Sequence, residues 1–140
     1  MKTQLTIILE EATVNAKGWL LVTITFPMIV AAREVRFVGF SGGAVPAHVG
    51  LVGMHGACQA AFGGTARMCL TDEVVKAPEI MGFTQDLQAW VQPGSERFPC
   101  SGWGSSVGSG TVLDARTMSF DSEPCKALLP VTCCQEESHQ

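Results

Sequence analysis

The sequence predicts an α+β domain that is held together by disulfide bonds, with two helices, a small antiparallel sheet and long loops. Apolar residues first follow the alternation of a strand, then the spacing of two helices, and finally form short extended pieces between loops. This order, without regular alternation of strands and helices, is typical of α+β folds. The 15 glycines indicate many turns, and the apolar content of 46% excludes a disordered chain.

Residues 1–32 are predicted to be a signal peptide with an unusually long and partly acidic start. The run GWLLVTITFPMIVAA over residues 18–32 carries no charge. As a helix it would be about 22 Å long, shorter than the ~30 Å core of a bilayer. It ends in small residues of the kind that a signal peptidase requires, so we expect cleavage after Ala32. The alternatives are a buried strand over residues 19–26 and an uncleaved anchor. A stable membrane anchor is not expected.

Residues 33–140 are expected to form one domain. Residues 34–41 have the alternation of a first strand, and the apolar residues of 53–62 share one face of a helix that ends at Gly63 and Gly64. A second helix is expected to start with Thr71 as its N-cap and to end near Ala77, before a proline. The remaining chain is expected to form strands over 87–92, 111–113, 117–120 and 128–134, a loop over 93–110 and a frayed tail. We expect the first and last strands to meet in one sheet.

The cysteines are the strongest signal in the sequence. There are six, all in the second part of the chain: Cys58, Cys69, Cys100, Cys125, Cys133 and Cys134. In an exported chain an even and clustered count predicts a disulfide framework, although six cysteines allow fifteen pairings. Neighbours on a strand point to opposite faces, so Cys133 and Cys134 should reach different partners. These features predict a secreted, periplasmic or cell-surface protein.

Several segments together resemble a known module. FVGFS, a glycine-rich stretch, GLVGMHGACQAAF and ARMCLTDEV are followed by AWVQ, CSGW and PVTCC. These segments, from about Val38 to Cys134, resemble secreted bacterial domains of unknown function that are related to endostatin and the C-type-lectin-like fold. The resemblance implies an irregular C-type-lectin-like domain with a binding or structural role outside the cytoplasm.

The resemblance also implies a disulfide pairing. In that fold a helix cysteine joins the final strand and a second bridge closes the long loop region. The implied pairs are Cys58 with Cys133 or Cys134, Cys69 with the one that remains, and Cys100 with Cys125. The calcium motifs of C-type lectins, Glu-Pro-Asn and Trp-Asn-Asp, have no counterpart, because the only Asn is residue 15. No calcium, other metal or cofactor is therefore expected.

Candidate ligand-binding residues lie in the glycine- and serine-rich loop: Trp103, Ser105 and Ser106. A tryptophan between glycines could stack on a sugar face, but the favoured interpretation of Trp103, as of Trp90, is that its ring covers a small core. The loop matches G-x-S-x-G at residues 104–108, but a nucleophile elbow needs a strand before it and a helix after it, and neither pattern is present.

We expect the protein to have a noncatalytic binding or structural role outside the cytoplasm, with a carbohydrate or a surface protein as its partner. The alternative is a secreted hydrolase that uses a serine of the loop or a metal site. A zinc site would combine His55 and Cys58 with Cys133 and Cys134, but the usual C-x-x-C spacing is missing. The net charge of −4 and the absence of a basic stripe argue against nucleic acid as a partner.

Overall fold

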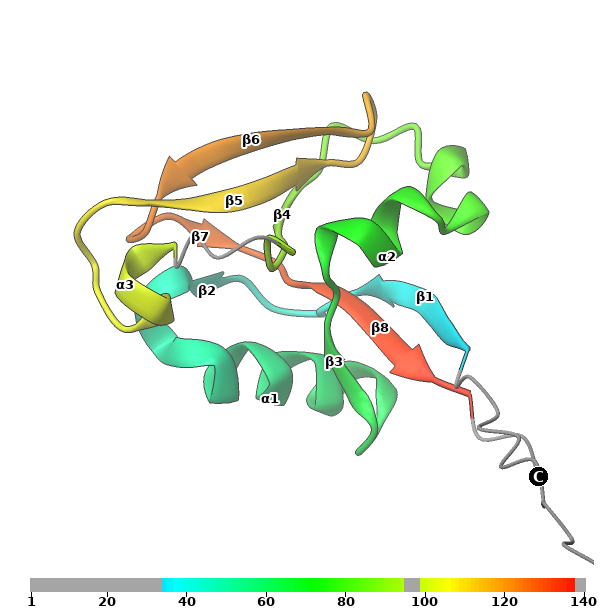
Figure 1. Ribbon diagram of the computed structural model, residues 1–140, viewed down its shortest axis with the longest axis horizontal. Helices are drawn as coiled ribbons and strands as arrows, with labels where there is room; N and C mark the ends of the chain where they lie inside the picture. The colour runs from blue at the N-terminus through cyan, green and yellow to red at the C-terminus, as the bar shows by residue number, and fades with distance from the viewer. Residues whose placement is uncertain (1–33, 95–98, 138–140) are drawn as a thin grey trace, which may run out of the picture. The chain divides into compact units, whose positions relative to one another are not determined.

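The computed structural model describes residues 34–94 and 99–137, which belong to one compact unit, Ala32–Gln140. The predicted signal peptide and its alternatives lie outside the described residues. The elements in chain order are β1 (Val35–Phe40), β2 (Val45–Pro46), η1 (Ala47–Val49), α1 (Gly50–Phe62), β3 (Ala66–Met68), α2 (Thr71–Val75), η2 (Pro78–Gly82), β4 (Gln88–Trp90), α3 (Cys100–Trp103), β5 (Ser109–Asp114), β6 (Ser119–Pro124), β7 (Leu128–Leu129) and β8 (Thr132–Glu136) (Figure 1). The predicted α+β class is confirmed. None of the helices in these ranges has the length and apolar character needed to cross a membrane.

Three small antiparallel sheets replace the single sheet that the sequence suggested. Their strand orders are β1-β8-β3, β2-β7 and β4-β5-β6. In the first sheet β8 lies between its two neighbours, with Phe37 opposite Cys134 on one side and Met68 opposite Cys133 on the other. The first and last strands of the domain therefore lie side by side, as predicted (Figure 1).

The two faces of this sheet pack against different helices. One face contacts α1 and contributes to an apolar core with Met54, Cys58 and Trp90. The other face lies beneath α2 and η2, where Phe37, Val74 and Ile80 form a second core. Because side chains alternate along a strand, β8 supplies one of its adjacent cysteines to each core.

Three disulfides fix this arrangement. They join Cys58 to Cys133, Cys69 to Cys134, and Cys100 to Cys125. The pairing implied by the resemblance is confirmed, and the choice it left open falls on Cys133 as the partner of Cys58. The first two bonds span 75 and 65 residues. Closing loops of this size stabilises the fold by roughly 4 kcal/mol each in the chain-entropy model.

Several boundaries differ from the sequence predictions. The first helix begins at Gly50, three residues before the predicted start. The N-cap of α2 is Leu70 rather than Thr71, whose Oγ1 instead accepts a hydrogen bond from the N–H of Gly94 at 3.1 Å. The second helix ends at Val75, and a separate 3₁₀ turn begins at the proline, Pro78.

The end of the domain is also more ordered than expected. The predicted strand over 128–134 is divided into β7 and β8 around Pro130, whose carbonyl accepts a hydrogen bond from the N–H of Trp90 at 2.8 Å. Strand β8 extends to Glu136, and the N–H of Glu137 donates to the carbonyl of Glu34 at 2.9 Å. Residues 135–137 are therefore paired with the start of β1 and are not a frayed tail.

Candidate functional site

Trp103 lies in the core. Only 2% of its surface is exposed, and its ring meets that of Trp90 edge to face, with centroids 6.0 Å apart. The Nε1 of Trp90 donates to the carbonyl of Val45 at 2.8 Å. Trp103 is therefore a core residue, and its ring is not available to stack on a ligand in this conformation.

The turn that carries Trp103 is left-handed. Residues Cys100–Trp103 of α3 have φ angles of 54°, 51°, 77° and 66°. Only glycine adopts this conformation at low cost, and only Gly102 is a glycine. Two restraints hold the turn, namely the disulfide of Cys100 and the burial of Trp103. The strained backbone brings the tryptophan ring onto Trp90.

Gly110 makes this packing possible. A Cβ at this position would lie 2.9 Å from Cζ3 of Trp90 and 3.1 Å from Sγ of Cys100. At these distances the added Cβ would crowd the ring carbon and the sulfur, so these neighbours would have to shift. The strand β5 must therefore present a glycine where the two rings and the disulfide meet.

Ser105 and Ser106 follow this turn on the surface. Ser105 accepts a hydrogen bond from the N–H of Val107 at 3.1 Å, which is a local loop contact. Ser106 is exposed, and among the described residues it forms no hydrogen bond to a histidine. The G-x-S-x-G match lies between the left-handed turn and β5, so the strand–turn–helix context of a nucleophile elbow is not formed.

The cysteines of the possible zinc site are all oxidised. Cys58, Cys133 and Cys134 are in disulfides, so they offer no thiolate to a metal. Burial, and next the positive charge of Arg67, lower the pKa of His55. Its Nε2 is buried without a hydrogen-bond partner in the described part of the chain. No group of three metal-ligating side chains is present in the described ranges.

A pocket of about 550 Å³ lies between the start of β1 and the end of α2. We call it the β1–α2 pocket. Its apolar lining consists of Val35, Phe37, Ala77 and Pro78. The charged residues that line it are Glu34, Arg36, Glu73, Lys76, Glu79 and Glu137. Apolar surface combined with a few polar groups is typical of ligand sites.

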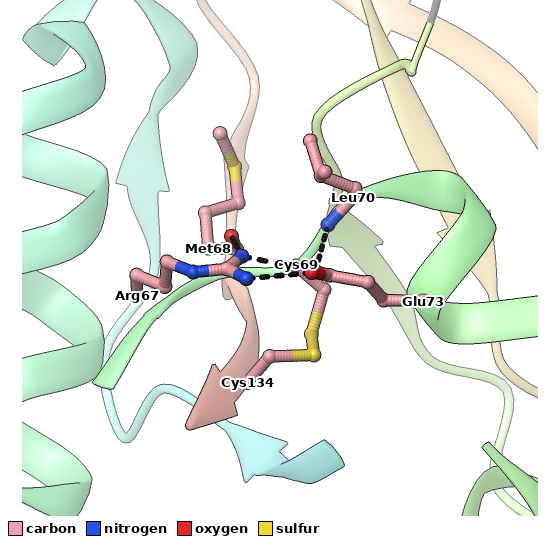
Figure 2. Close-up of polar contacts among 6 residues, drawn as sticks. All are labelled: Arg67, Met68, Cys69, Leu70, Glu73 and Cys134. Carbon is pink, nitrogen blue, oxygen red and sulfur yellow. Dashed lines mark hydrogen bonds and ion pairs between the residues drawn. A yellow bond between two sulfur atoms is a disulfide. The ribbon is translucent and has the colours of Figure 1, made fainter. Parts of the chain in front are cut away.

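One wall of the β1–α2 pocket is fixed by an ion pair between Arg67 of β3 and Glu73 of α2. The guanidinium donates to both carboxylate oxygens, at 2.5 and 2.9 Å, and the N–H of Leu70 donates to Oε2 at 2.8 Å (Figure 2). The side chains are 26% and 18% exposed. The pair ties the first turn of α2 to the sheet beside the disulfide of Cys69 (Figure 2).

These contacts determine the ionisation of Glu73. Burial by itself raises the pKa of this carboxyl, but the hydrogen bonds from Arg67 and Leu70, and the positive charges of Arg67 and Lys76, outweigh it. The pKa of Glu73 therefore lies below its usual value. The hydrogen bond to Glu73 is the main reason why the pKa of Arg67 is raised. Both groups stay charged at neutral pH.

The other charges of the pocket leave an excess of acid. Arg36 pairs with Glu137 at 3.4 Å in an exposed contact. Glu34 and Glu79 form no ion pair with any described residue, and Lys76 is the one lining cation without such a pair in those ranges. Within the described ranges, the pocket lining thus holds two carboxylates and one ammonium group that form no ion pair.

Comparison of the chain with protein-family models, curated proteins and solved structures finds no match. The likeness to endostatin and C-type-lectin-like domains therefore stays a prediction from the sequence. The sequence did not indicate the β1–α2 pocket, whose residues come from β1, the α2–η2 segment and the end of β8. The one available signal was the expected meeting of the first and last strands, which brings Glu34 near Glu137.

Proposed function

We propose that this chain is a noncatalytic binding domain that works outside the cytoplasm and holds its ligand in the β1–α2 pocket. The observation that carries the proposal is the pocket itself, which combines about 550 Å³ of space with an apolar lining and charged groups. The relation to endostatin and C-type-lectin-like domains is part of this proposal.

The disulfides support the location. All six cysteines are paired, which is compatible with an extracellular protein. Removal of residues 1–32 on export would complete this account, with a secreted, periplasmic or cell-surface domain as the product.

Of the two partners expected from the sequence, a surface protein is the one we propose. Trp103, the ring that the sequence offered for stacking on a sugar, is only 2% exposed. The charged rim of the pocket instead suits a charged group on a protein. No specific observation favours the hydrolase alternative, since Ser106 has no histidine partner among the described residues.

The experiment blocks the pocket with a large side chain. Oxidised full-length chain is applied to a glycan array and to an array of bacterial surface proteins, together with the variants Glu79→Trp and Glu123→Trp. Glu79 lines the pocket, whereas Glu123 lies on β6 and receives the same substitution as a control. We expect Glu79→Trp to weaken binding by about tenfold or more, as expected when an apolar site is blocked, and Glu123→Trp to leave it unchanged. Equal binding by all three proteins would overturn the proposal.

A further inference from the structure

Strand β1 lies at the edge of its sheet in the part of the chain that the structure describes. Its only paired neighbour among the described residues is β8, because the strand order is β1-β8-β3. The N–H of Glu137 donates to the carbonyl of Glu34, and Val35 faces Glu136 across the ladder. Since hydrogen-bonded and non-bonded positions alternate in antiparallel pairs, the N–H and C=O of Val35 and the N–H of Phe37 point away from β8.

Residues of this edge strand line the β1–α2 pocket. Four consecutive residues of the chain line it, Glu34, Val35, Arg36 and Phe37. Successive side chains of a strand point to opposite faces, so a pocket that touches all four is not confined to one face of the strand. The opposite wall is the segment Lys76–Glu79, at the end of α2 and the start of η2.

An unpaired strand edge beside a helix is a recurring site for extended peptides. The added chain pairs with the edge through its backbone, and its alternate side chains enter the adjoining pocket. At β1 the regular stretch is short, because a bulge between Phe37 and Gly39 interrupts the ladder. The site therefore has room for pairing over only a few residues.

The charge and the apolar lining of the pocket indicate which ligand side chain it would bind. Glu34 and Glu79 are the rim carboxylates that form no ion pair with a described residue, and the apolar lining of the pocket includes Val35, Phe37 and Ala77. A lysine or arginine side chain matches both features, because its methylene stem packs on apolar surface while its charged end reaches the rim. An acidic side chain would meet like charge at two positions.

We propose that the β1–α2 pocket binds an extended segment of a surface protein, which pairs with the free edge of β1 and places a basic side chain between Glu34 and Glu79. This inference rests on the proposed function and names the ligand class of the same pocket.

The test uses synthetic peptides and the oxidised, isotope-labelled full chain. The probe is the capped pentapeptide Ac-Thr-Val-Lys-Val-Thr-NH₂. One matched peptide replaces lysine with norleucine, and another carries N-methyl groups that remove the backbone donors. Dissociation constants come from the amide shifts of Val35, Phe37 and Ala77. We expect the norleucine peptide to bind about 3–10-fold more weakly, as for two exposed ion pairs. The N-methylated peptide should bind about tenfold more weakly or not at all.

The matched protein variants remove equal charge at two places. Glu34→Gln with Glu79→Gln neutralises the rim, and Asp121→Asn with Glu123→Gln neutralises two acids of β6. The rim variant should lose the preference for lysine over norleucine, and the β6 variant should keep it. Equal affinity of the lysine and norleucine peptides for the unmodified chain would overturn the inference.

Failure of this inference is distinguishable from failure of the proposed function. If no peptide shifts the amides of Val35 and Ala77, but Glu79→Trp still abolishes binding on the arrays, the peptide inference is wrong and the pocket remains the ligand site. If Glu79→Trp also has no effect on the arrays, both are wrong.

Discussion

The Arg67–Glu73 pair offers the sharpest test of how the pocket wall is held. Glu73→Gln removes the charge while it preserves size. Glu73 accepts two hydrogen bonds from the guanidinium and one from the N–H of Leu70, and a glutamine has only one oxygen to accept them. Because both side chains are less than a third exposed, we expect a loss of about 1–3 kcal/mol in the free energy of unfolding. For a domain of about 100 residues this lowers Tm by roughly 4–12 °C.

The assay is urea unfolding of the oxidised protein at several pH values, with Glu123→Gln as the control. The pKa of Glu73 is lowered in the folded state, so its contribution is present above the pKa of the unfolded chain and is lost as pH falls through the folded value. The difference between the unmodified protein and Glu73→Gln should therefore shrink as pH falls below about 5. A difference below about 0.5 kcal/mol at pH 7, the size of an ordinary surface substitution, or one that persists in strong acid, would refute the reasoning.

Three further predictions concern the core, the disulfides and export. Gly110→Ala should cost about 1–3 kcal/mol, because its Cβ would collide with Trp90 and Cys100; Gly64→Ala, where the Cβ meets nothing within 4 Å, is the control, and equal unfolding midpoints would contradict this. Replacing both Cys58 and Cys133 with serine should cost roughly 4 kcal/mol; a non-reducing peptide map that joins Cys58 to another cysteine would show that the premise is wrong. Amino-terminal sequencing of exported material should begin at Arg33, and a retained Met1 would count against cleavage.

Local patterns were sufficient to predict the fold class. The alternation near Val35, the helical spacing around Met54 and the clustered cysteines each appear within a short window of sequence, and each marks an element of the structure. The meeting of the first and last strands was predicted from the general tendency of such domains to close one sheet, and the β1–β8 pairing confirms it.

The left-handed turn was not predictable from the same patterns. Four consecutive positive φ angles are unfavourable for Cys100, Ser101 and Trp103 when the segment is considered alone. The turn depends on tertiary restraints, namely the bond to Cys125 and the space that Gly110 leaves for two rings. The sequence placed Trp103 in a loop and favoured a core role for it, which its burial confirms, but it did not indicate the left-handed turn that carries the ring into the core.

The β1–α2 pocket was missed for a related reason. Its residues come from separate elements, and Glu137 belongs to a tail that its composition marked as frayed. Composition does not show that Glu137 pairs with Glu34 through the backbone. The sequence instead directed attention to Ser105 and Ser106, which lie outside the pocket lining.

The measurement that tests the account most directly is a set of intermolecular nuclear Overhauser effects between the lysine pentapeptide and the labelled, oxidised chain. The account predicts contacts from the peptide backbone to Val35 and from the lysine side chain to Ala77 and Glu79. Contacts to Ser106 and Val107, with none to Val35, would contradict it and would place the ligand at the glycine- and serine-rich loop.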